Sequence, residues 1–213
     1  MDNMMILVGT IIAVALLALI IRAFRIYPEY KKGIYPALYG HFLWYAWEVL
    51  VLQDASVSPY LTKEIGKSYI TFSRFQENGQ VKAKFCTIFY NKGIMTVCFE
   101  HTDGQVRSKN SKSDWFIKRT DEKTKEEKTF RHNNISQPFM VYINKLANQY
   151  PDEHIEARIA LDDNSDYSLL KSDIKLIHYS DIIDELKNVQ AEFLTDDEIK
   201  TLFKKLLWIS KQV

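Results

Sequence analysis

The residues of this 213-residue chain that could do chemistry are few, and their spacing limits what they can do. Five histidines are scattered without ligand spacing, and the two cysteines, Cys86 and Cys98, form no Cys-x-x-Cys motif. These patterns argue against structural zinc and against a disulfide scaffold. The acidic pair Asp162-Asp163 lies in a Leu-Asp-Asp-Asn-Ser stretch after an apolar run, which is typical of a turn. We therefore predict no bound metal ion and no cofactor.

The clearest local pattern is a β-hairpin around the Tyr-Asn-Lys-Gly turn at residues 90–93. Both flanking runs are rich in β-branched and aromatic residues, as hairpin strands are. The expected strands are residues 82–89 and 94–101. A three-residue turn ending at Gly93 would place Cys86 directly opposite Cys98. We expect reduced thiols if the domain is cytoplasmic, whereas a location outside the cell would allow a cross-strand disulfide.

The elements that position these residues begin with an apolar segment at residues 4–21, which has no charged side chain. It is long enough for a transmembrane helix, and it lacks the basic start and the cleavage site of a signal peptide. Only Asp2 precedes it, whereas four basic residues follow it: Arg22, Arg25, Lys31 and Lys32. The positive-inside rule then predicts a single-pass protein with its carboxyl-terminal domain in the cytoplasm.

A second apolar segment, residues 36–52, has two interpretations. Its aromatic residues favour a buried or interfacial helix. A second membrane span is the alternative, but it would place His41 and Glu48 in hydrocarbon. The chain is accordingly divided into three parts: a transmembrane anchor at residues 1–26, a juxtamembrane linker with this apolar helix at 27–57, and a folded domain at 58–213.

The folded domain reads as an α/β fold with a mixed sheet. Its expected order is a short helix capped by Ser58, at least three antiparallel strands, an amphipathic helix, two more strands and two helices. The predicted strands after the hairpin include a charged strand pair within residues 107–132, and the predicted amphipathic helix covers residues 136–149. Ser180 and Thr195 are the expected caps of the last two helices, the second with Glu198 in a capping box. The net charge of +1 gives no overall attraction to nucleic acid or to a membrane surface.

The order of several short motifs resembles the nuclease-related domain (NERD) family, which has a restriction-endonuclease-like fold often found behind a membrane helix. The similar features run from about Gly40 to Leu207. They include the turn glycine Gly93, Gly104 eleven residues later, then Trp115 and the segment 133–137, which ends in Gln137. The resemblance implies a metal-dependent nuclease frame in a bacterial inner membrane.

The family's catalytic residues can be carried over by counting from Gly93. Its aspartate falls on Phe85, its glutamate on Cys98 and its lysine on Glu100. Phe85 cannot bind a hard cation, neutral Cys98 is a poor magnesium ligand, and Glu100 reverses the charge of the lysine. The resemblance therefore implies a nuclease-like domain without the nuclease site, although Glu100, Asp103 or Glu64 could supply relocated carboxylates.

Two functions follow from this interpretation. The first is a scaffold or partner-binding subunit of a membrane-associated protein complex. The second is a membrane-tethered nucleic-acid binder, or a nuclease with a relocated site, because basic and aromatic residues alternate in the charged strand pair. A solvated strand edge protected by lysines is the plainer explanation of the same pattern. The candidate partner- or nucleic-acid-binding residues are Arg107, Lys109, Lys112, Trp115, Phe116, Lys118, Arg119 and Gln137.

Overall fold

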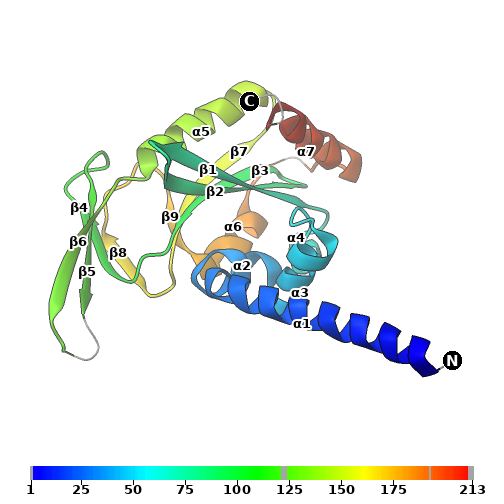
Figure 1. The fold of residues 1–213 in the computed structure, drawn as a ribbon. Coiled ribbons are helices and arrows are strands. Elements are labelled where there is room, and N and C mark those ends of the chain that lie inside the picture. The colour runs from blue at the N-terminus through cyan, green and yellow to red at the C-terminus, as the bar shows by residue number, and fades with distance from the viewer. Residues whose placement is uncertain (1, 121–123, 192, 211–213) are drawn as a thin grey trace.

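The structure, a computed structural model, describes residues 2–120, 124–191 and 193–210. A 31-residue helix, α1 (Asp2–Lys32), begins the chain. Its amino-terminal part projects beyond the rest of the molecule (Figure 1). Among the described residues it is the one helix long and apolar enough to cross a membrane, over Met4–Lys32, while Phe42–Leu52 forms only a shorter apolar helix. The second span considered from the sequence thus has no helix of sufficient length.

The folded part contains two mixed sheets, where the sequence indicated one. The five-stranded sheet has the order β1-β2-β3-β7-β9. The pairs β3–β7 and β7–β9 are parallel, and the pairs β1–β2 and β2–β3 are antiparallel. Its strands are β1 (Tyr69–Glu77), β2 (Gln80–Tyr90), β3 (Gly93–Glu100), β7 (Ile155–Leu161) and β9 (Leu176–His178). The four-stranded sheet has the order β6-β5-β4-β8 and consists of β6 (Glu127–His132), β5 (Trp115–Thr120), β4 (Gly104–Ser108) and β8 (Ser165–Leu169). The mixed α/β class is confirmed, and part of the connection between β5 and β6, within the expected charged strand pair, lies outside the described residues.

Helices cover both faces of the five-stranded sheet (Figure 1). On one face lie α5 (Ser136–Gln149) and α7 (Asp196–Ser210). The opposite face is covered by α2 (Tyr35–Tyr39), α3 (Phe42–Ala46), the π-helix η1 (Trp47–Leu52), α4 (Pro59–Ile65), the short 3₁₀ turn η2 (Tyr179–Asp181) and α6 (Ile182–Asn188). The two covered faces explain why β2 and β3 are apolar on both sides, a pattern that a half-exposed strand would not show.

Residues 27–57 belong to this core, although the sequence indicated a linker. Tyr30, Ile34, Leu38 and Tyr45 are buried in the same cluster as Cys86 of the sheet. The Tyr30 hydroxyl donates a hydrogen bond to the Gly40 carbonyl, which fixes the bend between α2 and α3. The anchor helix is therefore joined to the domain through packed side chains and no flexible tether separates them.

The hairpin differs from its predicted register by one residue. Tyr90 pairs with Gly93, so the connection has two residues, and Cys86 pairs with Val97. Gly93 is held in the strand because Ile94 N donates to the His154 carbonyl at 2.9 Å. A Cβ on Gly93 would lie 2.4 Å from that oxygen, so the close approach requires glycine. Since a one-residue shift reverses the faces, Cys86 and Cys98 lie in separate clusters on opposite sides of the sheet, and the predicted thiol pair is wrong.

The helix caps show where local sequence rules apply. The Ser58 hydroxyl accepts a hydrogen bond from Leu61 N at 3.1 Å, as expected for the start of α4. Thr195 and Glu198 form the predicted capping box. Ser180 does not cap α6: it lies inside η2, where the Asp181 carboxylate accepts from His178 N instead.

Candidate functional site

The two positions onto which the predicted resemblance carries nuclease carboxylates form an apolar contact between two adjacent strands. Phe85 of β2 is paired with Cys98 of β3, on the face that α5 covers. Phe85 is 2% exposed, and its ring is stacked with those of Tyr142 and Phe139, at centroid distances of 4.6 and 5.4 Å. A carboxylate here would be surrounded by aromatic rings and removed from water, which costs several kcal/mol unless it is neutralised (roughly 2–7 for even an uncharged polar group).

The Cys98 thiol is fully buried beside Phe85, in a cluster that also contains Trp115 and Ile159. Burial, and then the nearby charge of Glu100, hold the pKa of this thiol well above its usual value. Cys98 is therefore a neutral thiol at physiological pH, and a neutral thiol neither binds a hard cation nor attacks a substrate.

Glu100 ends β3 and is the one polar group of the three carried-over positions. Its carboxylate lies 3.6 Å from His132 Nε2 of β6 and raises the pKa of that imidazole above its usual value. Glu100 and Lys84 both line an open cavity of about 330 Å³, but the described ion pair of Glu100 is with His132.

The relocated carboxylates considered from the sequence do not gather around Glu100. Glu64 is in α4, in an ion pair with Lys187 at 2.6 Å. Asp103 is exposed, and neither residue lines the two cavities that Glu100 lines. Within the described part of the chain, no group of three or more histidine, cysteine or acidic side chains is arranged to hold a metal ion.

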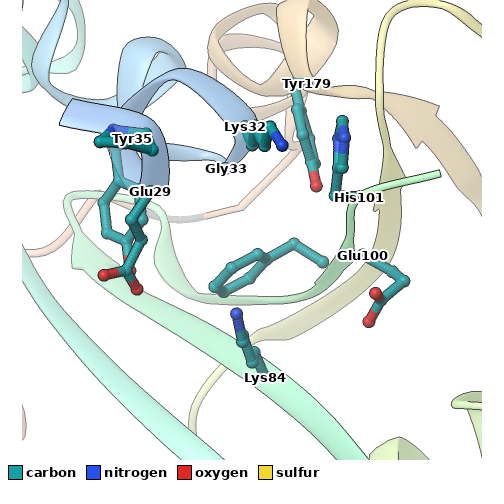
Figure 2. Close-up of a pocket in the computed structure, with 10 residues that line it drawn as sticks. Glu29, Lys32, Gly33, Tyr35, Lys84, Glu100, His101 and Tyr179 are labelled. Carbon is teal, nitrogen blue, oxygen red and sulfur yellow. The ribbon is translucent and has the colours of Figure 1, made fainter. Parts of the chain in front are cut away.

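The second cavity at Glu100 lies on the opposite face, between the end of α1 and the end of β3. Its volume is about 320 Å³, and it is lined by Pro28, Glu29, Lys32, Gly33, Tyr35, Lys84, Phe99, Glu100, His101 and Tyr179. In Figure 2 the Lys84 side chain points from the sheet toward α1, and the Lys32 ammonium points toward Tyr179. Several of its groups already have partners, because His101 pairs with Asp162 at 2.5 Å and the Tyr35 hydroxyl donates to Glu29 at 3.3 Å. These are the contacts of a structural polar cluster, and they contain no nucleophile paired with a base.

Trp115, predicted as a stacking platform, is inaccessible. It is 0% exposed, packs in the α5-side cluster and lies 6.2 Å from the His132 ring. Trp115 is therefore not accessible for contact with a base or a partner in this structure. Exposed positions on a strand alternate with buried ones, and Trp115 has the inward parity of Ile117.

The other predicted binding residues are divided among several surfaces. Arg107 and Phe116 are opposite each other on the exposed face of the four-stranded sheet. Arg119 is on the other face, over the Phe130 ring, and Lys118 pairs with Glu127 at 2.8 Å. Lys109 is exposed in the β4–β5 turn, while Lys112 and Gln137 line a third cavity of about 500 Å³. The predicted binding residues are therefore not gathered on one surface.

Sequence reasoning missed β8, which completes the exposed face. Leu169 pairs with Arg107, Arg107 with Phe116, and Phe116 with Arg131, so these four side chains form one row across the sheet. The alternation of Asp166, Tyr167, Ser168 and Leu169 was the available signal for this strand.

Comparison with family models, with curated proteins and with solved structures finds no match to this chain.

Proposed function

We propose that this protein is a membrane-anchored, catalytically degenerate nuclease-like domain that acts as a scaffold or partner-binding subunit of a membrane-associated complex. The observation that carries the proposal is the Phe85–Cys98 pair, which lies under the stacked rings of α5. A metal-dependent nuclease needs two carboxylates that hold a divalent ion against a phosphate. Here the two positions are filled by side chains that pack together.

A restriction-endonuclease-like frame is part of the proposal. It is supported by the β2–β3 hairpin that turns just before Gly93, by Trp115 on a following strand and by Gln137 in the first turn of α5. A binding role requires the fold but not the carboxylates, so it is consistent with a frame that lacks them. The scaffold role explains why the domain keeps its core while the two carboxylate positions are apolar.

The partner surface that we propose is the exposed row on the four-stranded sheet, formed by Arg107, Phe116, Arg131 and Leu169. Apolar Phe116 and Leu169 lie beside two guanidinium groups, a mixture that is enriched at protein interfaces. This sheet projects from the helix-covered body of the molecule (Figure 1). Arg131 already pairs with Asp114 at 2.5 Å, so an apolar protein surface with an acidic group opposite Arg107 would complement this row.

The anchor and its orientation complete the proposal. One amino-terminal helix is the candidate span, and Arg22, Arg25, Lys31 and Lys32 follow its apolar part. The positive-inside rule supports a single-pass protein with its domain in the cytoplasm. The resemblance to the nuclease-related domain family is what supports a bacterial inner membrane. The nucleic-acid alternative is weaker because Trp115 is buried and the basic residues are on different surfaces.

Site-specific photo-cross-linking in native membranes tests the partner surface. A photoreactive amino acid replaces Phe116 in one variant and Val141, which is 64% exposed on α5, in a matched control. We expect a discrete cross-linked protein product at position 116 that is several-fold weaker at position 141 and is lost when Arg107→Glu is added. Equal labelling at both positions, or none at either, would contradict the proposed surface.

A further inference from the structure

The helical segment formed by α3 and η1 exposes a large apolar face. Its five exposed side chains are between 40% and 79% accessible: Leu43, Trp44, Trp47, Val51 and Leu52. We call these five residues the α3–η1 face. The spacings of three and four residues from Trp44 to Trp47 and Val51 place them on one side of a helix. In the π-helix η1 the hydrogen bonds join residues i and i+5, so Trp47 and Leu52, which are five residues apart, lie on about the same side of the helix.

This face has no charge. Between Phe42 and Leu52 the one residue that is charged at neutral pH is Glu48, and its 7% exposure assigns it to the covered side of the segment. The covered side also includes Tyr45, which packs in the core cluster. The exposed side of the segment is therefore apolar, and the protein does not cover it. A contiguous uncharged patch of this kind marks contact with a membrane or with another protein.

The α3–η1 face is continuous with the surface of the candidate span. Tyr27 of α1 and Phe42 of α3 are in contact, with ring centroids 5.0 Å apart, and α1 packs against α2, α3 and η1. Leu19, Ala23 and Ile26 are partly covered, whereas most of their neighbours on α1 are exposed. Since Leu19 belongs to the apolar stretch, the covering elements reach the level at which that stretch ends. Figure 1 shows α3 beside α1 on one side of the domain.

The length of α1 fixes the depth at which this contact occurs. At 1.5 Å per residue, the 31-residue helix is about 46 Å long, and its apolar stretch of residues 4–21 accounts for about 27 Å. The hydrocarbon core of a bilayer is about 30 Å thick, so the rest of α1 lies in the headgroup layer and beyond it. The α3–η1 segment packs along this last part. Tryptophan is enriched at that level because its ring is apolar and its N–H group is polar.

We propose that the α3–η1 face is inserted into the interfacial layer of the same bilayer that α1 spans. The face contacts lipid, and this contact holds the domain against the membrane in one orientation. Three observations carry the proposal: the face is uncharged, it presents two exposed tryptophans, and it is packed against the span at the depth of the headgroups. The proposal depends on the anchor and is independent of the loss of nuclease chemistry.

Collision accessibility of nitroxide labels on the full chain in phospholipid vesicles tests it. Cysteine variants Leu43→Cys and Trp47→Cys report on the face, Val14→Cys on the span, and Val141→Cys is the matched exposed control on α5. The native cysteines are fully buried, so the parent protein measures the background label. Dissolved oxygen concentrates in lipid, whereas a neutral nickel complex stays in water.

We expect labels at 43 and 47 to collide several-fold more with oxygen and several-fold less with the nickel complex than the label at 141. Nickel accessibility at 43 and 47 equal to that at 141 would overturn the inference. So would protection from both reagents, because it would show that a protein surface covers the face. The label at position 14 tests the membrane span separately from the interfacial contact. Frequent oxygen collisions at position 14, combined with a water-exposed position 47, would support the span and contradict only the interfacial contact.

Discussion

The two sheets of this molecule differ in how their faces are covered. In the five-stranded sheet, helices cover both faces, and β2 and β3 are buried along most of their length. In the four-stranded sheet, Val106, Trp115 and Ile117 are buried on one face, while Arg107 and Phe116 are exposed on the other. The positions that resemble nuclease carboxylates are in the covered sheet. The comparison teaches that Phe85 and Cys98 pack inside the covered sheet, whereas the exposed side chains are on the four-stranded sheet.

The largest predicted effect compares one phenylalanine from each sheet. Phe85→Ala removes a stacked, buried ring and should lower the free energy of unfolding by about 3–5 kcal/mol. Phe116→Ala, at 37% exposure, should lower it by less than about 1 kcal/mol. Urea unfolding of the detergent-solubilised protein, followed by near-ultraviolet circular dichroism, measures both. Equal costs for the two variants would show that the two sheets do not differ in the way described.

A smaller effect tests the polar contact inside the covered sheet. Thr87 Oγ1 is hydrogen-bonded to the Tyr142 hydroxyl at 2.8 Å and lies 3.1 Å from Thr96 Oγ1. Tyr142→Phe should therefore lower the free energy of unfolding by about 1 kcal/mol, since it leaves Thr87 with one partner fewer. Tyr167→Phe, on the half-exposed β8, is the control and should be nearly neutral. An unchanged free energy of unfolding in Tyr142→Phe would show that this hydrogen bond does not stabilise the core.

The border between the two sheets should show a pH dependence. The Glu100 carboxylate raises the folded-state pKa of His132, so the pair stabilises the protein fully below the unfolded pKa of about 6.5. That stabilisation is lost as the pH rises through the folded pKa. Glu100→Gln should cost less than about 1 kcal/mol at acidic pH and close to nothing at alkaline pH. Denaturant titrations at both pH values measure this, and a cost that grows with pH would have the wrong sign.

The smallest effect concerns the two thiols. Cys86 and Cys98 are buried on opposite faces of the sheet, so oxidation of the folded protein should form no bond between them. Burial also raises the pKa of the Cys86 thiol far above its usual value, which slows alkylation until the protein unfolds. Non-reducing mass analysis of oxidised native membranes is the measurement. A Cys86–Cys98 disulfide would require the predicted one-residue shift in the hairpin.

Local sequence patterns predicted the elements that local physics decides. The strand that became β1, the amphipathic helix α5, the strand β7 and the Thr195–Glu198 capping box follow from alternation, helical periodicity and capping chemistry. These features need only neighbours within a few residues. The helix α5 occupies the expected residues 136–149, and the capping box lies at the expected pair.

Distant contacts decided what the sequence did not predict. The register at Gly93 depends on the His154 carbonyl, which is far along the chain. Trp115 is buried because α5 and the five-stranded sheet meet at that point, and the tyrosines of α2 and α3 enter the core only after they fold back beside α1. A turn rule or a charge pattern contains none of this information.

The central claim is that the Phe85, Cys98 and Glu100 positions cannot assemble a metal-nuclease site. Calorimetric titration of the full chain with Mg²⁺ and Mn²⁺, in parallel with cleavage assays on DNA and RNA and a Glu100→Ala control, tests it most directly. We predict no saturable metal binding and no cleavage in either protein. Stoichiometric metal binding with cleavage that Glu100→Ala abolishes would contradict the account.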